Sequence, residues 1–204
     1  LLRRNPDGFL TEKAIEIDRW RNADERPLRN ALAAMDIDGD GIDELVSGRT
    51  SGEKAGAQEI QFHRISVQPS PRITFLGVDR ALIPSGATLS ALASLEQIGL
   101  PGRLAVAYRQ NEKDYLSQYA LALNGPADLV ASQTWTSPDG GRITGIAAVP
   151  PSDENGAQLV LAERSGNEQR IVKAQIQGDG QIIPNLSVTW QDVRNDLFWI
   201  GPIR

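Results

Sequence analysis

The stretch ALAAMDIDGDGIDELVSGR, Ala31–Arg49, places an acidic, glycine-rich loop between two apolar segments. Two later stretches share this plan: ALASLEQIGLPGRLAVAYR, Ala91–Arg109, and GIAAVPPSDENGAQLVLAER, Gly145–Arg164. Each has a small apolar strand, a turn-rich loop, a second apolar strand and a closing arginine. Repetition at a period of tens of residues indicates a repeat architecture.

Two sequence markers recur with matching spacing. The closing arginines are 60 and 55 positions apart (109 − 49 and 164 − 109), at Arg49, Arg109 and Arg164. Large aromatic residues recur with steps of 55, 60 and 55, at Trp20, Phe75, Trp135 and Trp190. Because the longer step falls in the middle repeat in both series, we interpret the aromatic residues as one repeated packing position rather than as sugar-stacking platforms.

Each period predicts four short strands, rich in Val, Ile, Leu and Thr and separated by turn signals such as PSG, NGP and SPDGG. In the first period the predicted strands are Leu28–Met35, Ile42–Gly48, Glu59–Val67 and Arg72–Val78. In the second they are Thr88–Leu95, Arg103–Tyr108, Tyr115–Leu123 and Asp128–Trp135. In the third they are Arg142–Val149, Gln158–Glu163, Gln169–Gln177 and Gln181–Trp190.

Four antiparallel strands in such a period are typical of a β-propeller blade. The sequence therefore predicts an all-β fold, a β-propeller segment over residues 1–204 with blades at about 28–79, 88–137 and 142–191. Small residues suit the crowded inner edge of the blades, and they recur on the first strands at Ala31, Ala33, Ala91, Ala93, Ala147 and Ala148. The alternative is a β-sandwich with accidental repetition.

The two ends of the sequence predict parts of further blades. Residues 11–20 align with a fourth strand, and residues 196–203 align with a first strand. The second and third strands are missing between them, so the two pieces cannot pair to close a four-bladed ring. Because open blade faces would leave apolar surface in water, we expect a larger propeller, or one that a partner chain completes.

Composition excludes several classes of protein and site. The 204 residues are 40% apolar and 23% charged, as in ordinary globular proteins. The net charge of −5 has no basic stripe, which disfavours a nucleic-acid partner. The absence of cysteine excludes disulfides, thiolate metal sites and thiol nucleophiles. No apolar run approaches the roughly 18 to 20 residues that span a bilayer, so we expect no transmembrane segment.

The acidic loop has the spacing of a metal site. Counting from Asp36, carboxylates fall at positions one, three, five and nine, which are Asp36, Asp38, Asp40 and Glu44. Gly39 and Gly41 allow the sharp backbone path that brings the carboxylates together. Ile42, at position seven, offers its backbone carbonyl, and we expect its side chain to enter the following strand. Hard oxygen ligands on a flexible loop favour Ca²⁺ over Mg²⁺.

A helix–loop–helix calcium hand needs a glutamate at position twelve, but Ser47 stands there and a strand follows. DIDGDGIDELV instead resembles the calcium loop of FG-GAP or VCBS-type repeats, the blades of integrin α-like propellers. The resemblance implies a structural Ca²⁺ held between a blade's first two strands by Asp36, Asp38, Asp40, the Ile42 carbonyl and Glu44. The aligned loops EQIGLPG and PPSDENG lack this spacing and are expected to be metal-free.

The sequence offers no convincing catalytic group. The single histidine, His63, lies in the strand-like run EIQFHRISV, and no nucleophile elbow surrounds any serine. The carboxylate pairs Asp24–Glu25 and Asp153–Glu154 lie in polar segments and are interpreted as solvated turns. Trp199 falls outside the aromatic series and is the one aromatic residue to test for ligand contact.

We therefore predict a non-catalytic, calcium-binding propeller module with a structural or protein-interaction role. The resemblance places it outside the cytoplasm, as an extracellular, cell-surface or periplasmic protein, where calcium is abundant. Its expected partners are a protein or the remaining blades, with a glycan as a further possibility. The alternatives are a carbohydrate-binding, lectin-like propeller and a polysaccharide-degrading enzyme domain of similar fold.

Overall fold

The computed structural model describes residues 27–50, 58–66, 72–79, 82–122, 127–137, 140–149 and 157–191. These residues form three four-stranded antiparallel sheets, which confirms the predicted all-β class. The predicted end strands, 11–20 and 196–203, lie outside the described residues. So do Trp20, Trp199 and both polar carboxylate pairs.

Every sheet is a meander of four consecutive strands, and neighbours in sequence are neighbours in the sheet. Sheet 1 contains β1 (Pro27–Met35), β2 (Glu44–Thr50), β3 (Gln58–Ser66) and β4 (Arg72–Asp79). Sheet 2 contains β5 (Thr88–Ser94), β6 (Arg103–Gln110), β7 (Lys113–Ala120) and β8 (Asp128–Trp135). Sheet 3 contains β9 (Arg142–Val149), β10 (Gln158–Ser165), β11 (Glu168–Ile176) and β12 (Ile182–Gln191). The 3₁₀ turn η2 (Glu96–Ile98) lies between β5 and β6.

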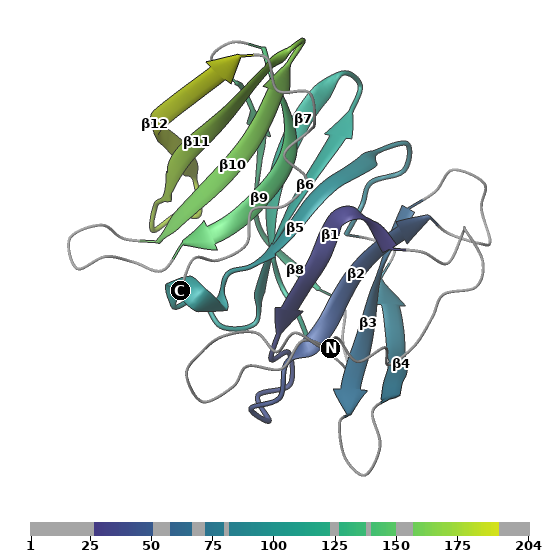
Figure 1. Ribbon diagram of the computed structural model, residues 1–204. Coiled ribbons are helices and arrows are strands. Elements are labelled where there is room, and N and C mark those ends of the chain that lie inside the picture. The colour runs from purple at the N-terminus through teal and green to yellow at the C-terminus, as the bar shows by residue number, and fades with distance from the viewer. Residues whose placement is uncertain are drawn as a thin grey trace, which may run out of the picture.

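The sheets pack through their first strands. β5 lies between β1 and β9, and the other strands of each sheet spread outward from this line (Figure 1). The alanines of the first strands fit this crowded position, since five of the six predicted ones are buried: Ala31, Ala91, Ala93, Ala147 and Ala148. The described sheets do not close into a ring, so the structure has the predicted four-stranded units without showing a complete propeller.

Two apolar cores fill the spaces between the sheets. One joins Met35, Val46 and Ile60 of sheet 1 to Leu104 and Val106 of sheet 2, among other residues. The other joins the opposite face of sheet 2 to sheet 3, and it includes Ala105, Ala107, Leu116, Leu159 and Leu161. Sheet 2 therefore packs on both faces, which explains the continuous apolar run Leu104–Tyr108 in β6.

Gly48 allows a close approach between the first two sheets. A Cβ atom at this position would overlap the Leu89 side chain of β5 and would also lie 2.9 Å from the Ala31 Cβ. A larger residue would therefore push the sheets apart. The glycine is needed so that the Leu89 side chain can lie against the backbone of β2.

Two sequence markers proved less regular than predicted. Ala33 pairs with Val46, whereas Ala93 pairs with Ala105, so the loop of sheet 1 is one residue longer. Arg49 consequently falls one position before the place of Arg109.

The aromatic series is also not one packing position. Trp135 is buried, whereas Phe75 is 56% exposed. Phe75 pairs with His63, on the face of sheet 1 that points away from sheet 2, while Trp135 pairs with Asp114 on the face toward sheet 3. The side chain of Trp190 lies outside the described part of the chain. Nor do the described residues include a helix long and apolar enough to cross a bilayer.

Candidate metal centre

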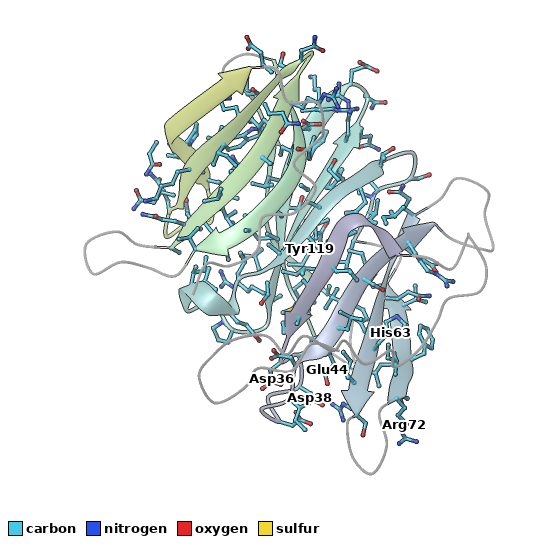
Figure 2. All side chains as sticks on the ribbon, in the orientation of Figure 1. Asp36, Asp38, Glu44, His63, Arg72 and Tyr119 are labelled. Carbon is cyan, nitrogen blue, oxygen red and sulfur yellow. The ribbon has the colours of Figure 1, made fainter. Side chains whose placement is uncertain are left out.

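The acidic loop joins β1 to β2, at the strand junction that the sequence predicted. Gly39 and Gly41 have φ angles of 78° and 83°, in the left-handed region that side-chain-bearing residues rarely adopt. These two turns reverse the chain within a few residues. As a result, the alternating carboxylates face a common centre. Figure 2 shows Asp36, Asp38 and Glu44 gathered at this end of sheet 1.

Asp36 organises the loop backbone. Its Oδ1 accepts hydrogen bonds from the amide nitrogens of Gly39 (2.7 Å) and Asp40 (3.2 Å), and its Oδ2 accepts one from Gly41 (2.8 Å). Asp40 Oδ1 similarly accepts from the Ile42 amide at 2.9 Å. The loop is therefore held in shape by its own carboxylates.

The structure brings Asp36, Asp38 and Asp40 together. Each offers a carboxylate oxygen, and these atoms all lie within 4.8 Å of one another. Asp38 and Asp40 are exposed and Asp36 is partly buried. Three carboxylates this close repel one another in the absence of a positive charge.

Arg64 of β3 supplies that charge, and nothing in the spacing of the acidic loop predicted this role. Its Nη2 donates to Asp38 Oδ2 and lies 3.4 Å from Asp40 Oδ2. The same guanidinium donates to Glu44 Oε1 from Nε at 3.0 Å and from Nη2 at 2.8 Å. Bonding to Arg64 lowers the pKa of Asp38, and bonding to Glu44 and then Asp38 raises the pKa of Arg64.

Glu44, the predicted ninth-position ligand, is fully buried and lies outside the group of three aspartates. Its Oε2 accepts from the Ile37 amide at 3.1 Å, and its Oε1 binds Arg64. Glu44 is thus joined to the aspartates through the guanidinium. Ile42 precedes β2, and its side chain is 53% exposed, so the expectation that it enters the strand was wrong. The strand begins later because the Ile42 amide is bound to Asp40.

Sheet 2 also contacts this loop. Glu96, in η2, accepts hydrogen bonds from the Asp36 amide at Oε2 (3.2 Å) and from the Gly102 amide at Oε1 (3.4 Å). One carboxylate therefore ties the acidic loop to the corresponding loop of the next sheet. The sequence signal was only that Glu96 directly follows the predicted strand Thr88–Leu95.

His63 lies apart from the acidic centre. Its side chain is 6% exposed and meets Phe75 edge-on, with ring centroids 5.7 Å apart. Its Nε2 is buried and has no hydrogen-bond partner among the described residues. Burial, together with the nearby Arg49 charge, lowers the pKa of His63. The structure thus places His63 within a strand, as predicted (Figure 2), next to Arg64 but on the opposite face of sheet 1.

A second buried carboxylate, Glu163, has a different character. It accepts hydrogen bonds from Trp135 Nε1 (2.5 Å), Ser137 Oγ (2.9 Å) and Arg170 (2.6 Å from Nη2). Trp135 is the last residue of β8 in sheet 2, and Ser137 comes just after it. Arg170 lies opposite Glu163 in sheet 3. Because its charge and its oxygens are already matched, this group fastens one sheet to the next.

Comparisons with known proteins add little to these geometric findings. No protein-family model and no curated protein sequence matches the chain. A similar solved structure is that of an exotype rhamnogalacturonan lyase, YesX, with 15% sequence identity and a TM-score of 0.42. The alignment covers 92% of this chain but 35% of the lyase, so the chain spans about a third of that protein. A likeness this weak carries no argument about function.

Proposed function

We propose that the chain is a non-catalytic, calcium-binding segment of a β-propeller, in which the loop after β1 binds Ca²⁺ and thereby fixes the junction of two strands. The observation that carries the proposal is the convergence of Asp36, Asp38 and Asp40 to within 4.8 Å. Their donor atoms are all carboxylate oxygens, which suit Ca²⁺. The Ile42 carbonyl and Glu44 complete the ligand set that we assign.

The contacts of Arg64 support the assignment of a cation site, and they also make Arg64 a competitor of Ca²⁺ for the same carboxylates. A guanidinium on Asp38, Asp40 and Glu44 means that the carboxylates already attract a cation. To admit Ca²⁺ with this ligand set, Arg64 must release Asp38, Asp40 and Glu44. We therefore propose that Arg64 lowers the calcium affinity of the loop and neutralises it when calcium is scarce.

The propeller assignment is supported by the three repeated meanders and by the line of first strands β1, β5 and β9. In this arrangement each four-stranded sheet is one blade. The module would then present loops and outer strands to a protein partner or to the remaining blades. We place it outside the cytoplasm, in the extracellular space, at the cell surface or in the periplasm, because weak extracellular sites fill at millimolar calcium.

The non-catalytic role is supported by the place of His63. The chain has one histidine, and its side chain is buried and contacts Phe75 edge-on. A buried imidazole with a lowered pKa is poorly placed to exchange protons with a substrate.

Thermal unfolding with calcium and with a chelator tests the metal site. Calcium should raise the melting temperature of the unmodified chain, because a ligand that binds only the folded state stabilises it. Asp38→Ala should abolish the shift. Asp43→Ala is the matched control: it removes one exposed carboxylate from the same loop but outside the group of three, and should keep the shift.

Arg64→Gln separates the two parts of the proposal. If Arg64 competes with calcium, this variant should bind calcium more tightly in a calorimetric titration. Weaker binding in Arg64→Gln would instead make Arg64 a support of the site. Equal melting temperatures with calcium and with chelator in the unmodified chain would contradict the metal site itself.

A further inference from the structure

The acidic loop is attached to sheet 2 at two successive residues, Asp36 and Ile37. The Asp36 amide donates to Glu96 Oε2 of η2 at 3.2 Å. The Ile37 side chain is 9% exposed and belongs to the apolar core between sheets 1 and 2. The loop backbone therefore takes part in the contact between the two sheets, at the point where its first carboxylate lies.

Asp36 connects this attachment to the carboxylates of the loop. Its amide is held by Glu96, while its side chain accepts hydrogen bonds from the amides of Gly39 and Gly41. A shift of the Asp36 backbone would move its carboxylate, which is one of the three that lie within 4.8 Å of one another. The position of the first assigned ligand thus depends on a glutamate of the neighbouring sheet.

Glu96 is in turn fixed within sheet 2. Its Oε1 accepts from the Gly102 amide at 3.4 Å, and its backbone carbonyl accepts from the Gly99 amide at 2.9 Å. The Gly102 carbonyl accepts from the amide of Leu121, just after β7, at 2.8 Å. Leu121 belongs to the same apolar core as Ile37. The contacts of Glu96 therefore lead from the acidic loop, through the loop between β5 and β6, to the end of β7.

We propose that Ca²⁺ binding and the packing of sheet 2 on sheet 1 reinforce each other through Glu96, which acts as a positioning residue for the calcium loop. This inference rests on the calcium site proposed above. Coupling between two sites is reciprocal, so the support that sheet 2 gives to calcium affinity returns as stability of the contact between the sheets when calcium binds. The calcium concentration then sets how firmly the first two sheets are joined.

A calorimetric titration with Ca²⁺ tests the coupling. Glu96→Ala should bind calcium about fivefold more weakly than the unmodified chain, at the lower end of the usual range for coupled sites. Glu96→Gln keeps an oxygen that can accept from the Asp36 amide, so it should recover most of the affinity although it loses the same charge. Glu112→Ala is the control, because it removes an exposed glutamate from sheet 2 and should leave the affinity unchanged.

Amide hydrogen exchange by NMR on the full chain gives a second readout, at the Gly99 amide of sheet 2. Calcium should slow exchange at this amide by about fivefold in the unmodified chain, because the coupling acts in both directions. Glu96→Gln should keep most of this response, and Glu96→Ala should lose it. The Gly140 amide, which donates to the Ser137 carbonyl at 3.2 Å between β8 and β9, is the control and should not respond to calcium.

The outcomes separate the coupling from the calcium site itself. If the unmodified chain binds no calcium in the titration, the proposed function fails and the coupling fails with it. If it binds calcium but Glu96→Ala binds equally well, or the Gly99 amide does not respond to calcium, the site stands and the coupling alone is wrong. Equal weakening in Glu96→Ala and Glu96→Gln would show that Glu96 acts through its charge, which would overturn the positioning role. Should Glu96→Ala fail to fold, the Gly99 response in the unmodified chain still decides the matter.

Discussion

Sheets 1 and 2 are the same meander, but they order the junction between their first two strands by opposite means. In sheet 1 the loop is exposed; Asp36 accepts hydrogen bonds from its backbone amides, and the Arg64 guanidinium contacts Asp38 and Asp40. In sheet 2 the corresponding loop forms η2, and its apolar residues Leu95 and Ile98 are 0% and 6% exposed. A strand junction can be ordered by charge or by apolar burial, and only the charged version creates a place for a cation.

The third strands of sheets 1 and 2 also differ, in the hydrogen bonding of one buried side chain. His63 and Tyr119 occupy equivalent places, opposite Leu45 and Leu104. Burial raises the pKa of Tyr119 and lowers that of His63, because in both cases the neutral form is favoured. The Tyr119 hydroxyl, however, donates to the Leu82 carbonyl at 3.2 Å, whereas His63 Nε2 has no partner among the described residues.

Leu95→Ala should break the apolar junction with the largest effect. Removing a fully buried leucine side chain costs about 3 kcal/mol of unfolding free energy. The loss should be the same with and without calcium, since this loop has no aspartate group. Urea denaturation measures it, with Leu129→Ala, at a 57% exposed position, as a control that should change little. A loss of stability that depends on calcium would show that the apolar loop and the acidic loop are coupled through the Leu95 side chain as well as through Glu96.

Glu96→Ala should have an intermediate effect, because it removes the link between the two loops. Losing the bonds from the Asp36 and Gly102 amides should cost about 1 kcal/mol. The measurement is urea denaturation at neutral pH. Glu112→Ala removes an exposed glutamate from sheet 2 and should cost much less. Equal losses in the two variants would show that the Glu96 bridge adds nothing to stability.

His63→Gln should produce the smallest effect, visible only as a change in pH dependence. Because the folded pKa of His63 lies below its ordinary value of 6.5, the unfolded chain takes up the proton first as the pH falls. The neutral histidine's contribution is therefore complete above about pH 6.5 and declines below it, toward the folded pKa. Unfolding free energies between pH 7 and 5 should fall less steeply in the variant. An unchanged slope would show that His63 does not contribute to the pH dependence of the unfolding free energy.

Much of the fold could be predicted because strand periodicity and turn signals are local. All twelve strands predicted for the three blades are present, and two of them, Asp128–Trp135 and Arg142–Val149, have the predicted bounds. The start of β7 was missed because its turn uses Asn111 and Glu112 at positive φ, without the glycine that usually marks such a turn.

The candidate site was predictable where its residues are close in sequence. The spacing of Asp36, Asp38 and Asp40 identified their convergence. The roles of Arg64 and Glu96 depend on strand register and on the packing of sheet 2 against sheet 1, so they appear only in three dimensions. The buried position of Glu44 follows from the same register, because Glu44 and Arg64 are paired directly across β2 and β3.

The consecutive strand order of each sheet has a consequence for how such a chain can change over evolutionary time. Four neighbouring strands complete a unit, and none of the described strands crosses into another sheet. Duplication of one such stretch would add a sheet without rerouting the rest of the chain, and deletion would remove one equally cleanly. A cation loop like the one after β1 could then be gained or lost in a single unit while its neighbours keep their apolar junctions.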